Sequence, residues 1–145
     1  MNRKAQISVE YLLIMTMALA IIVPGSLLFY RYSDDSNDKL VAGQINQIGK
    51  NIVNNAEEMN TIGKNSWITL DISFPKSTNN VYISGNSALV IVYQTGIGLT
   101  EAVFFSDVPL NGSYSNNISQ NFHSGFMKVK IESKGEYVLI QESIS

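Results

Sequence analysis

Hydrophobic and polar positions divide the chain into three segments with different periodicities. The first is continuously apolar, because the twenty residues from Tyr11 to Tyr30 carry no charge. A helix of that length rises about 30 Å, which matches the hydrocarbon thickness of a bilayer. The second segment is amphipathic, with apolar residues every three or four positions: Leu40, Val41, Ile45, Ile48, Ile52, Ala56, Met59 and Ile62. This spacing predicts a helix with one apolar stripe, which ends at Gly63.

The third segment is predicted to consist of β-strands. Short runs rich in β-branched and aromatic residues are separated by turn residues, and they cover residues 67–74, 81–83, 88–93, 100–106, 126–132 and 136–141. Residues 84–87 and 133–135 have the composition of hairpin turns. Residues 107–125 are rich in Asn, Ser and Gly, and we expect them to form a surface loop.

The three segments together predict an α+β fold. A long N-terminal helix, apolar in its first half (residues 6–32) and amphipathic in its second (residues 33–63), packs on a C-terminal antiparallel β-sheet head (residues 64–145). Whether the helix continues through residues 24–38 stays open. Pro24 removes a backbone hydrogen bond there, and the chain turns polar after Tyr30, with aspartates at positions 34, 35 and 38.

Composition narrows the class of protein. Charged residues make up 15% of the chain and hydrophobic residues 45%, which is too apolar for disorder and too polar for a protein with many membrane spans. The formal net charge of −2 gives no reason to expect a nucleic-acid partner. The chain has no cysteine, so disulfides and thiolate chemistry are excluded.

Few residues suggest catalysis or a cofactor. His123 is the only histidine and lies in the predicted loop, where a solvated side chain is expected rather than a metal ligand or base. Gly96 and Gly98 lack the third glycine and the following helix of a phosphate-binding loop. We therefore expect no enzymatic activity, no cofactor and no metal. The same loop contains two N-glycosylation sequons, which begin at Asn111 and Asn117.

The start of the apolar segment carries unusual charges. Arg3 and Lys4 precede it, which favours a cytoplasmic N-terminus and an exported C-terminus. Glu10 stands at the mouth of the segment, where a carboxylate needs a partner. A secretory signal cleaved after residues 18–20 would leave an apolar mature end, and a plain signal anchor explains the length but not Glu10.

A third interpretation accounts for Glu10. Gln6, Ser8, Glu10 and Tyr11, preceded by a short basic leader, resemble the class III signal peptide of archaeal type IV pilin-like proteins. The resemblance covers roughly residues 3 to 30, and the order of helix and strands agrees with it. It implies cleavage between Ala5 and Gln6 by a prepilin peptidase, which removes the leader (residues 1–5) and retains the apolar helix.

The resemblance also implies a function. Cleavage creates an α-amine on Gln6, and this amine is a counter-ion for Glu10, within one chain or between neighbouring subunits. The chain would then be a pilin that reaches the cell surface as a filament of identical subunits, with an assembly ATPase and a membrane platform protein as partners. Before assembly it would be a single-pass membrane protein. A non-polymerising anchored binding module and a pseudopilin of a secretion or uptake machine are the alternatives.

Overall fold

A computed structural model describes residues 3–144 and confirms the predicted α+β class. Residues 1–2 of the predicted leader lie outside this range. Helix α1 (Arg3–Ile62) passes through Pro24 and the polar stretch after residue 33 without a break, which settles the continuity that the sequence left open. The chain divides into two compact units, one up to Asn37 and one from Asp38 onward, and we describe each by itself.

The helix ends where the sequence predicts. Gly63 adopts a φ of 123° and donates its N–H to the carbonyl of Met59 at 3.1 Å. Its missing Cβ makes this left-handed conformation accessible, as at many helix C-termini. The Ser66 hydroxyl also donates to the Met59 carbonyl at 2.7 Å, so the end of the helix is fixed to the segment that enters the first strand.

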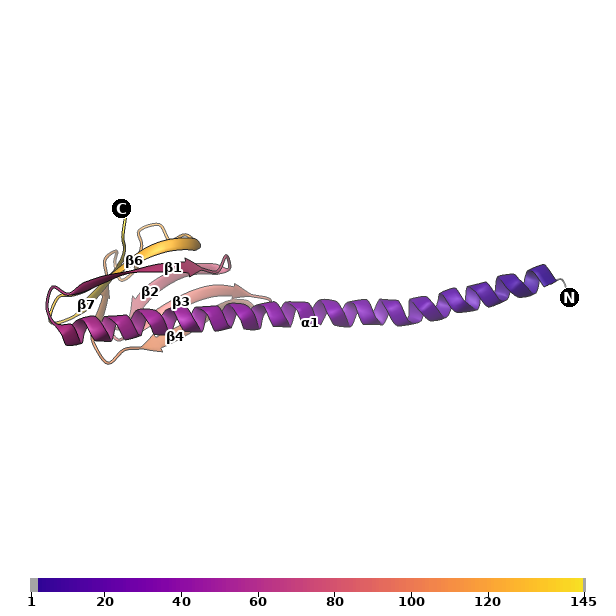
Figure 1. Ribbon diagram of the computed structural model, residues 1–145, viewed down its shortest axis with the longest axis horizontal. Helices are drawn as coiled ribbons and strands as arrows, with labels where there is room; N and C mark the ends of the chain where they lie inside the picture. The colour runs from indigo at the N-terminus through magenta and orange to yellow at the C-terminus, as the bar shows by residue number, and fades with distance from the viewer. Residues whose placement is uncertain (1–2, 145) are drawn as a thin grey trace. The chain divides into compact units, whose positions relative to one another are not determined.

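Seven strands follow within the described residues: β1 (Trp67–Phe74), β2 (Thr78–Ser84), β3 (Ala88–Thr95), β4 (Gly98–Phe105), β5 (Leu110–Gly112), β6 (Gly125–Ser133) and β7 (Val138–Glu142). They form two sheets, with the orders β1-β6-β7-β5 and β2-β3-β4. Figure 1 shows both groups of strands beside the last part of α1. The strand pairs are antiparallel except β5 with β7, which is parallel.

The two hairpin turns are confirmed. Gly85 and Asn86 have φ angles of 58° and 57° between β2 and β3, as a two-residue turn with the twist of its strands requires. The Ser87 N–H closes this turn by donating to the Ser84 carbonyl at 3.2 Å. Between β6 and β7, Gly135 has a φ of 93°. Turn residues therefore determined the local pairing of β2 with β3 and of β6 with β7.

The prediction of a surface loop at residues 107–125 was wrong in part, because the irregular and largely exposed segment includes a short strand and four buried residues. Leu110 and Ile118 are fully buried, and the first of them begins strand β5. Gly112 is buried as well, and a Cβ there would lie 2.5 Å from the backbone of Asn116, so the position has no room for a side chain. Isolated apolar residues in a polar segment thus anchor it to the core, and the strand that begins at Leu110 forms the one parallel pair described above, with β7.

One hydrophobic core joins the second half of α1 to both sheets. Ile45, Ile52, Ala56 and Met59 contribute from the predicted stripe and are at most 6% exposed. The ends of the predicted stripe were assigned wrongly, since Leu40 is 68% exposed and Ile62 is 63% exposed. At the first end the neighbouring Val41 packs against the core instead of Leu40.

Candidate assembly surface

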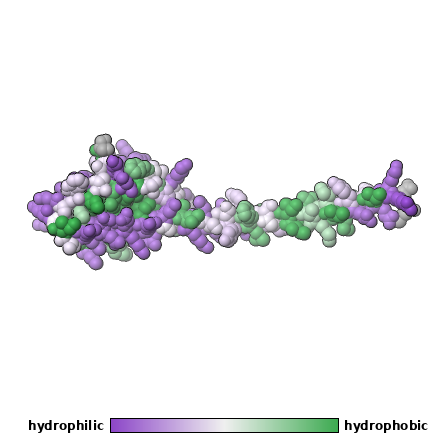
Figure 2. Space-filling view, viewed as in Figure 1, coloured by the Kyte–Doolittle hydropathy of each residue, from purple (hydrophilic) through white to green (hydrophobic). Residues whose placement is uncertain are grey.

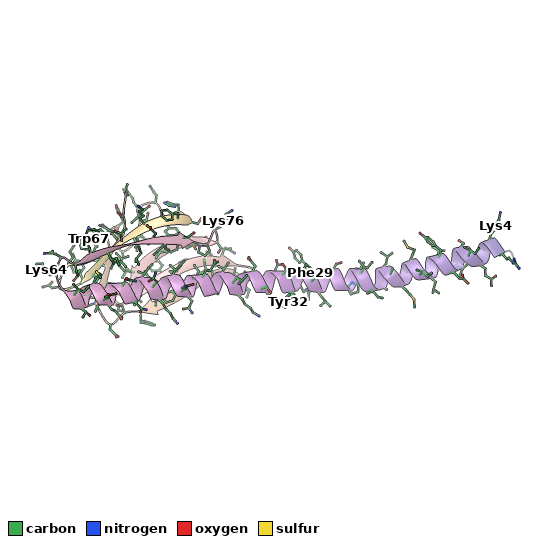
Figure 3. The ribbon with its side chains drawn as sticks, in the orientation of Figure 1. Lys4, Phe29, Tyr32, Lys64, Trp67 and Lys76 are labelled. Atoms are coloured by element: carbon green, nitrogen blue, oxygen red, sulfur yellow. The ribbon has the colours of Figure 1, made fainter. Side chains whose placement is uncertain are left out.

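The N-terminal unit presents an uncovered apolar surface. Its large apolar side chains are between 45% exposed, at Met15, and 74% exposed, at Ile21, Phe29 and Tyr32. Figure 2 shows apolar side chains gathered along this part of α1, and Figure 3 shows Phe29 and Tyr32 projecting from the helix. Mean hydropathy reaches 2.4 over the most apolar 18 residues, so the helix is long and apolar enough to cross a membrane.

Glu10 lies at the start of this surface. It shares one shallow depression of the helix with Ala5, Gln6 and Val9, which places Gln6 and Glu10 on the same face. Residues four apart are neighbours on a helix, so the backbone nitrogen of Gln6 lies one turn before the carboxylate. The ion pairs among residues 3–144 all lie in the β-strand region, and none of them includes Glu10.

The bond between Ala5 and Gln6 lies in the first turn of α1. The first four N–H groups of a helix have no partner within it, so this turn unwinds at little cost. Ser8 and Tyr11 are exposed in the following turn. The five residues of the predicted signal motif and cleavage site therefore occupy two successive turns and are accessible to another protein.

The two sequons lie in different surroundings. Asn111 lies in β5, is half-buried, and precedes the exposed Ser113 by two residues. Asn117 accepts a hydrogen bond from the Asn80 side chain at 3.0 Å, and its Ser119 is only 4% exposed. The structure thus fixes the second sequon in place and leaves the hydroxyl of the first accessible.

His123 is exposed, as expected, but it has partners that the sequence did not predict. Its Nε2 lies 3.2 Å from Oε1 of Glu142, and the other oxygen of that carboxylate accepts a hydrogen bond from Ser119 at 2.5 Å. The carboxylate lies between the serine and the histidine, so the histidine cannot accept a proton from the serine. This cluster connects the segment before β6 to the end of β7 by hydrogen bonds, and we interpret its role as structural.

A second charged cluster lies on the outer surface of β1 and β6. Lys130 stands 5.3 Å from the ring centroid of Trp67, which is 61% exposed. Glu132 accepts from Lys134 at 2.8 Å and pairs with Lys130 at 3.3 Å. The hydrogen bond from Lys134, assisted by Lys130, holds the pKa of Glu132 below its ordinary value of 4.5.

The uncovered apolar part of α1 is a surface of the kind that packs against lipid or another protein. Among residues 3–144, no group of three or more metal-ligating side chains occurs. A long N-terminal helix that is apolar first and then packs on β-sheets is a pilin-like architecture. Comparison with protein-family profiles, with curated proteins and with solved structures found no match to this chain.

Proposed function

We propose that this chain is a pilin, a structural subunit of an archaeal type IV pilus-like surface filament with a role in adhesion. The observation that carries the proposal is the uncovered apolar surface of residues 7–32. A surface of that size is far larger than soluble proteins expose, and it requires lipid or protein around it. In the proposal, lipid surrounds it before assembly, and the helices of neighbouring subunits surround it afterwards.

The position of Glu10 supports this exchange of surroundings. A carboxylate in an apolar environment is strongly unfavourable without a counter-ion. Cleavage after Ala5 would place a new α-amine on Gln6, on the helix face that carries Glu10. An amine from a neighbouring subunit would complete the pair, and the energetic penalty of an unpaired charge would then set the axial register between subunits.

The proposal names the partners of this process. A prepilin peptidase cuts between Ala5 and Gln6 on the cytoplasmic side, and an assembly ATPase and a membrane platform protein extract the subunit from the bilayer. Removal of Arg3 and Lys4 lowers the basic residues from ten to eight, against twelve acidic ones. The role of the chain is structural, so no cofactor and no catalytic residue enter the proposal.

Mass spectrometry of the N-terminus of the protein isolated from its native cells tests the proposal. We expect a chain that begins at Gln6, with or without cyclisation of the glutamine. A chain that begins at Met1 and never appears in surface filaments would instead support an anchored binding module. Electron microscopy of the same cells distinguishes a long filament from the short assembly of a pseudopilin.

A further inference from the structure

Charge is distributed unevenly between the two sheets. Every lysine after residue 63 lies in β6 or at the ends of β1 and β6: Lys64, Lys76, Lys128, Lys130 and Lys134. Figure 3 shows Lys64 and Trp67 at one end of β1 and Lys76 at the other. By contrast, residues 78–106, which form β2, β3, β4 and their turns, contain no basic residue and a single acidic one, Glu101.

The exposed side of β4 is apolar around that one carboxylate. Burial alternates along the strand, so the outward side chains are 64% exposed at Leu99, 46% at Val103 and 78% at Phe105. Ile97, in the preceding turn, is fully exposed. We call this surface the β4 face; it consists of Ile97, Leu99, Glu101, Val103 and Phe105. Such a row of apolar residues on an edge strand invites contact with another protein surface.

The outer side of β1 and β6 carries exposed aromatic rings and charges of both signs. Trp67 and Phe126 are each 61% exposed, and the exposed Lys128 lies between them on the same side of the sheet. Lys128 is opposite Asp71 in the strand register, yet it forms none of the ion pairs found among residues 3–144. We call this surface the β1–β6 face; it consists of Trp67, Thr69, Asp71, Ser73, Phe126, Lys128, Lys130 and Glu132.

We infer that the β4 face of one copy docks on the β1–β6 face of the next copy, with Glu101 opposite Lys128. The inner sides of both sheets meet in one core, so these outer faces point away from each other and one copy can bind two neighbours. The faces complement each other at one position, because Glu101 is the one charge of the β4 face and Lys128 belongs to no ion pair found among residues 3–144. Both faces also offer the aromatic or aliphatic side chains that interfaces favour. Contact between two different faces is heterologous, and it generates an open helical assembly when the rotation between copies does not close into a ring.

This inference rests on the proposed filament, because it assigns the contact that the heads make within it. The chain has no cysteine, so introduced cysteines report on single contacts. We would express the full-length double variant Val103→Cys/Ser73→Cys in the native cells and treat intact cells with a bifunctional maleimide. Ser73 lies exposed on β1 and differs from cysteine by one atom, so the substitution leaves the fold intact. A ladder of crosslinked multimers is expected.

Single variants define the geometry of the contact. Val103→Cys alone and Ser73→Cys alone should give no multimers, since neither face meets its own copy. Crosslinking of Val103→Cys alone would overturn the inference in favour of a symmetric contact between two β4 faces. The pair Ser113→Cys/Ser73→Cys is the matched control, because Ser113 is exposed but lies outside both faces. It should stay monomeric.

Charge reversal tests the proposed ion pair. Glu101→Lys in the double-cysteine background should lower the multimer yield about tenfold, as expected when attraction becomes repulsion at an exposed site. Lys128→Glu should do the same, and the combination of both reversals should restore the multimers. A failure of the combination to rescue would overturn the pairing of Glu101 with Lys128.

The two proposals fail in distinguishable ways. If filaments are seen by electron microscopy but the double-cysteine variant yields no multimers, the head contact is wrong and the proposed function stands. If no filaments exist and the chain still begins at Met1, the proposed function fails. The inferred contact fails with it unless multimers appear in the isolated membranes.

Discussion

Gly49 of α1 lies against the ring of Phe104 of β4, so closely that a Cβ on the glycine would collide with the ring. Gly49 is buried, whereas Gly43, two turns earlier, has nothing within 4 Å of the position that its Cβ would occupy. Both glycines weaken a helix to the same degree by themselves. Their different surroundings therefore allow the packing contribution of Gly49 to be separated from its helix propensity.

The first prediction concerns this pair of glycines. Gly49→Ala should destabilise the head by about 1–2 kcal/mol, because overpacking outweighs the gain of about 1 kcal/mol in helix propensity. Gly43→Ala should stabilise it by up to about 1 kcal/mol. Urea unfolding of the detergent-solubilised chain, followed by the fluorescence of Trp67, the only tryptophan, measures both. Equal effects of the two variants would contradict the packing role of Gly49.

Two helix carboxylates hold the ends of β4, and the second prediction concerns them. Asp38 accepts the N–H of Gly96 at 2.9 Å, and Glu57 accepts the N–H of Asp107 at 3.0 Å. Asp38→Ala should accelerate amide hydrogen exchange at Gly96, and Glu57→Ala should do so at Asp107, each by about fivefold for the loss of a bond of about 1 kcal/mol. Exposed Glu58→Ala is the matched control. Acceleration spread over the whole head would indicate global destabilisation instead.

The sequence predicted those features that depend on local rules. The periodicity of Ile45, Ile52 and Met59 and the turn residues around Gly85 are consequences of helix and hairpin geometry, and the structure confirms them. The burial of Gly49 could not be predicted, because a glycine carries no apolar side chain. The glycine leaves room for the ring of Phe104, which lies 55 residues later in the sequence. The parallel pairing of the three-residue β5 with β7 likewise depends on contacts distant in sequence.

The sequence predicted the apolar helix that forms the candidate assembly surface. The structure leaves almost all residues from Gln6 to Tyr30 exposed. The counter-ion of Glu10 could not be found within the described chain, because the proposed partner is an amine that exists only after cleavage. The cluster of His123, Glu142 and Ser119 was missed since the glutamate is 19 residues from the histidine and no motif connects them.

The third prediction concerns pH. The pKa of Glu132 is lowered in the folded head, so its ion pairs contribute stability that is fully present above pH 4.5 and is lost as the pH falls through the lower folded value. For ion pairs of this kind at the protein surface, with a half-buried carboxylate, the contribution is about 0.5 kcal/mol. Glu132→Gln should remove this part of the acid dependence when unfolding is measured between pH 6 and pH 3. Glu136→Gln, an exposed neighbour, should leave the dependence unchanged.

The fourth prediction concerns the sequons. If the chain is glycosylated, Asn111 should carry the glycan at higher occupancy than Asn117, because Ser113 is exposed whereas the Ser119 hydroxyl is buried and bonded to Glu142. Glycopeptide mass spectrometry of the native protein measures the two occupancies. Higher occupancy at Asn117 would mean that modification precedes folding of the head.

The fifth prediction concerns the charge at the start of the apolar surface. Glu10→Ala should leave membrane insertion and cleavage after Ala5 intact, since it makes the helix more apolar, but it should abolish normal filament assembly. The reason is that the Gln6 amine of the incoming subunit would then be buried without a counter-ion, a loss of about 3–5 kcal/mol per contact. Thr16→Ala, outside the signal motif on the same exposed helix, is the control and should assemble. Electron microscopy counts filaments per cell, and immunoblotting of membranes confirms equal amounts of processed subunit. Normal filaments from Glu10→Ala would show that the ion pair does not set the register, even if cleavage at Gln6 is found.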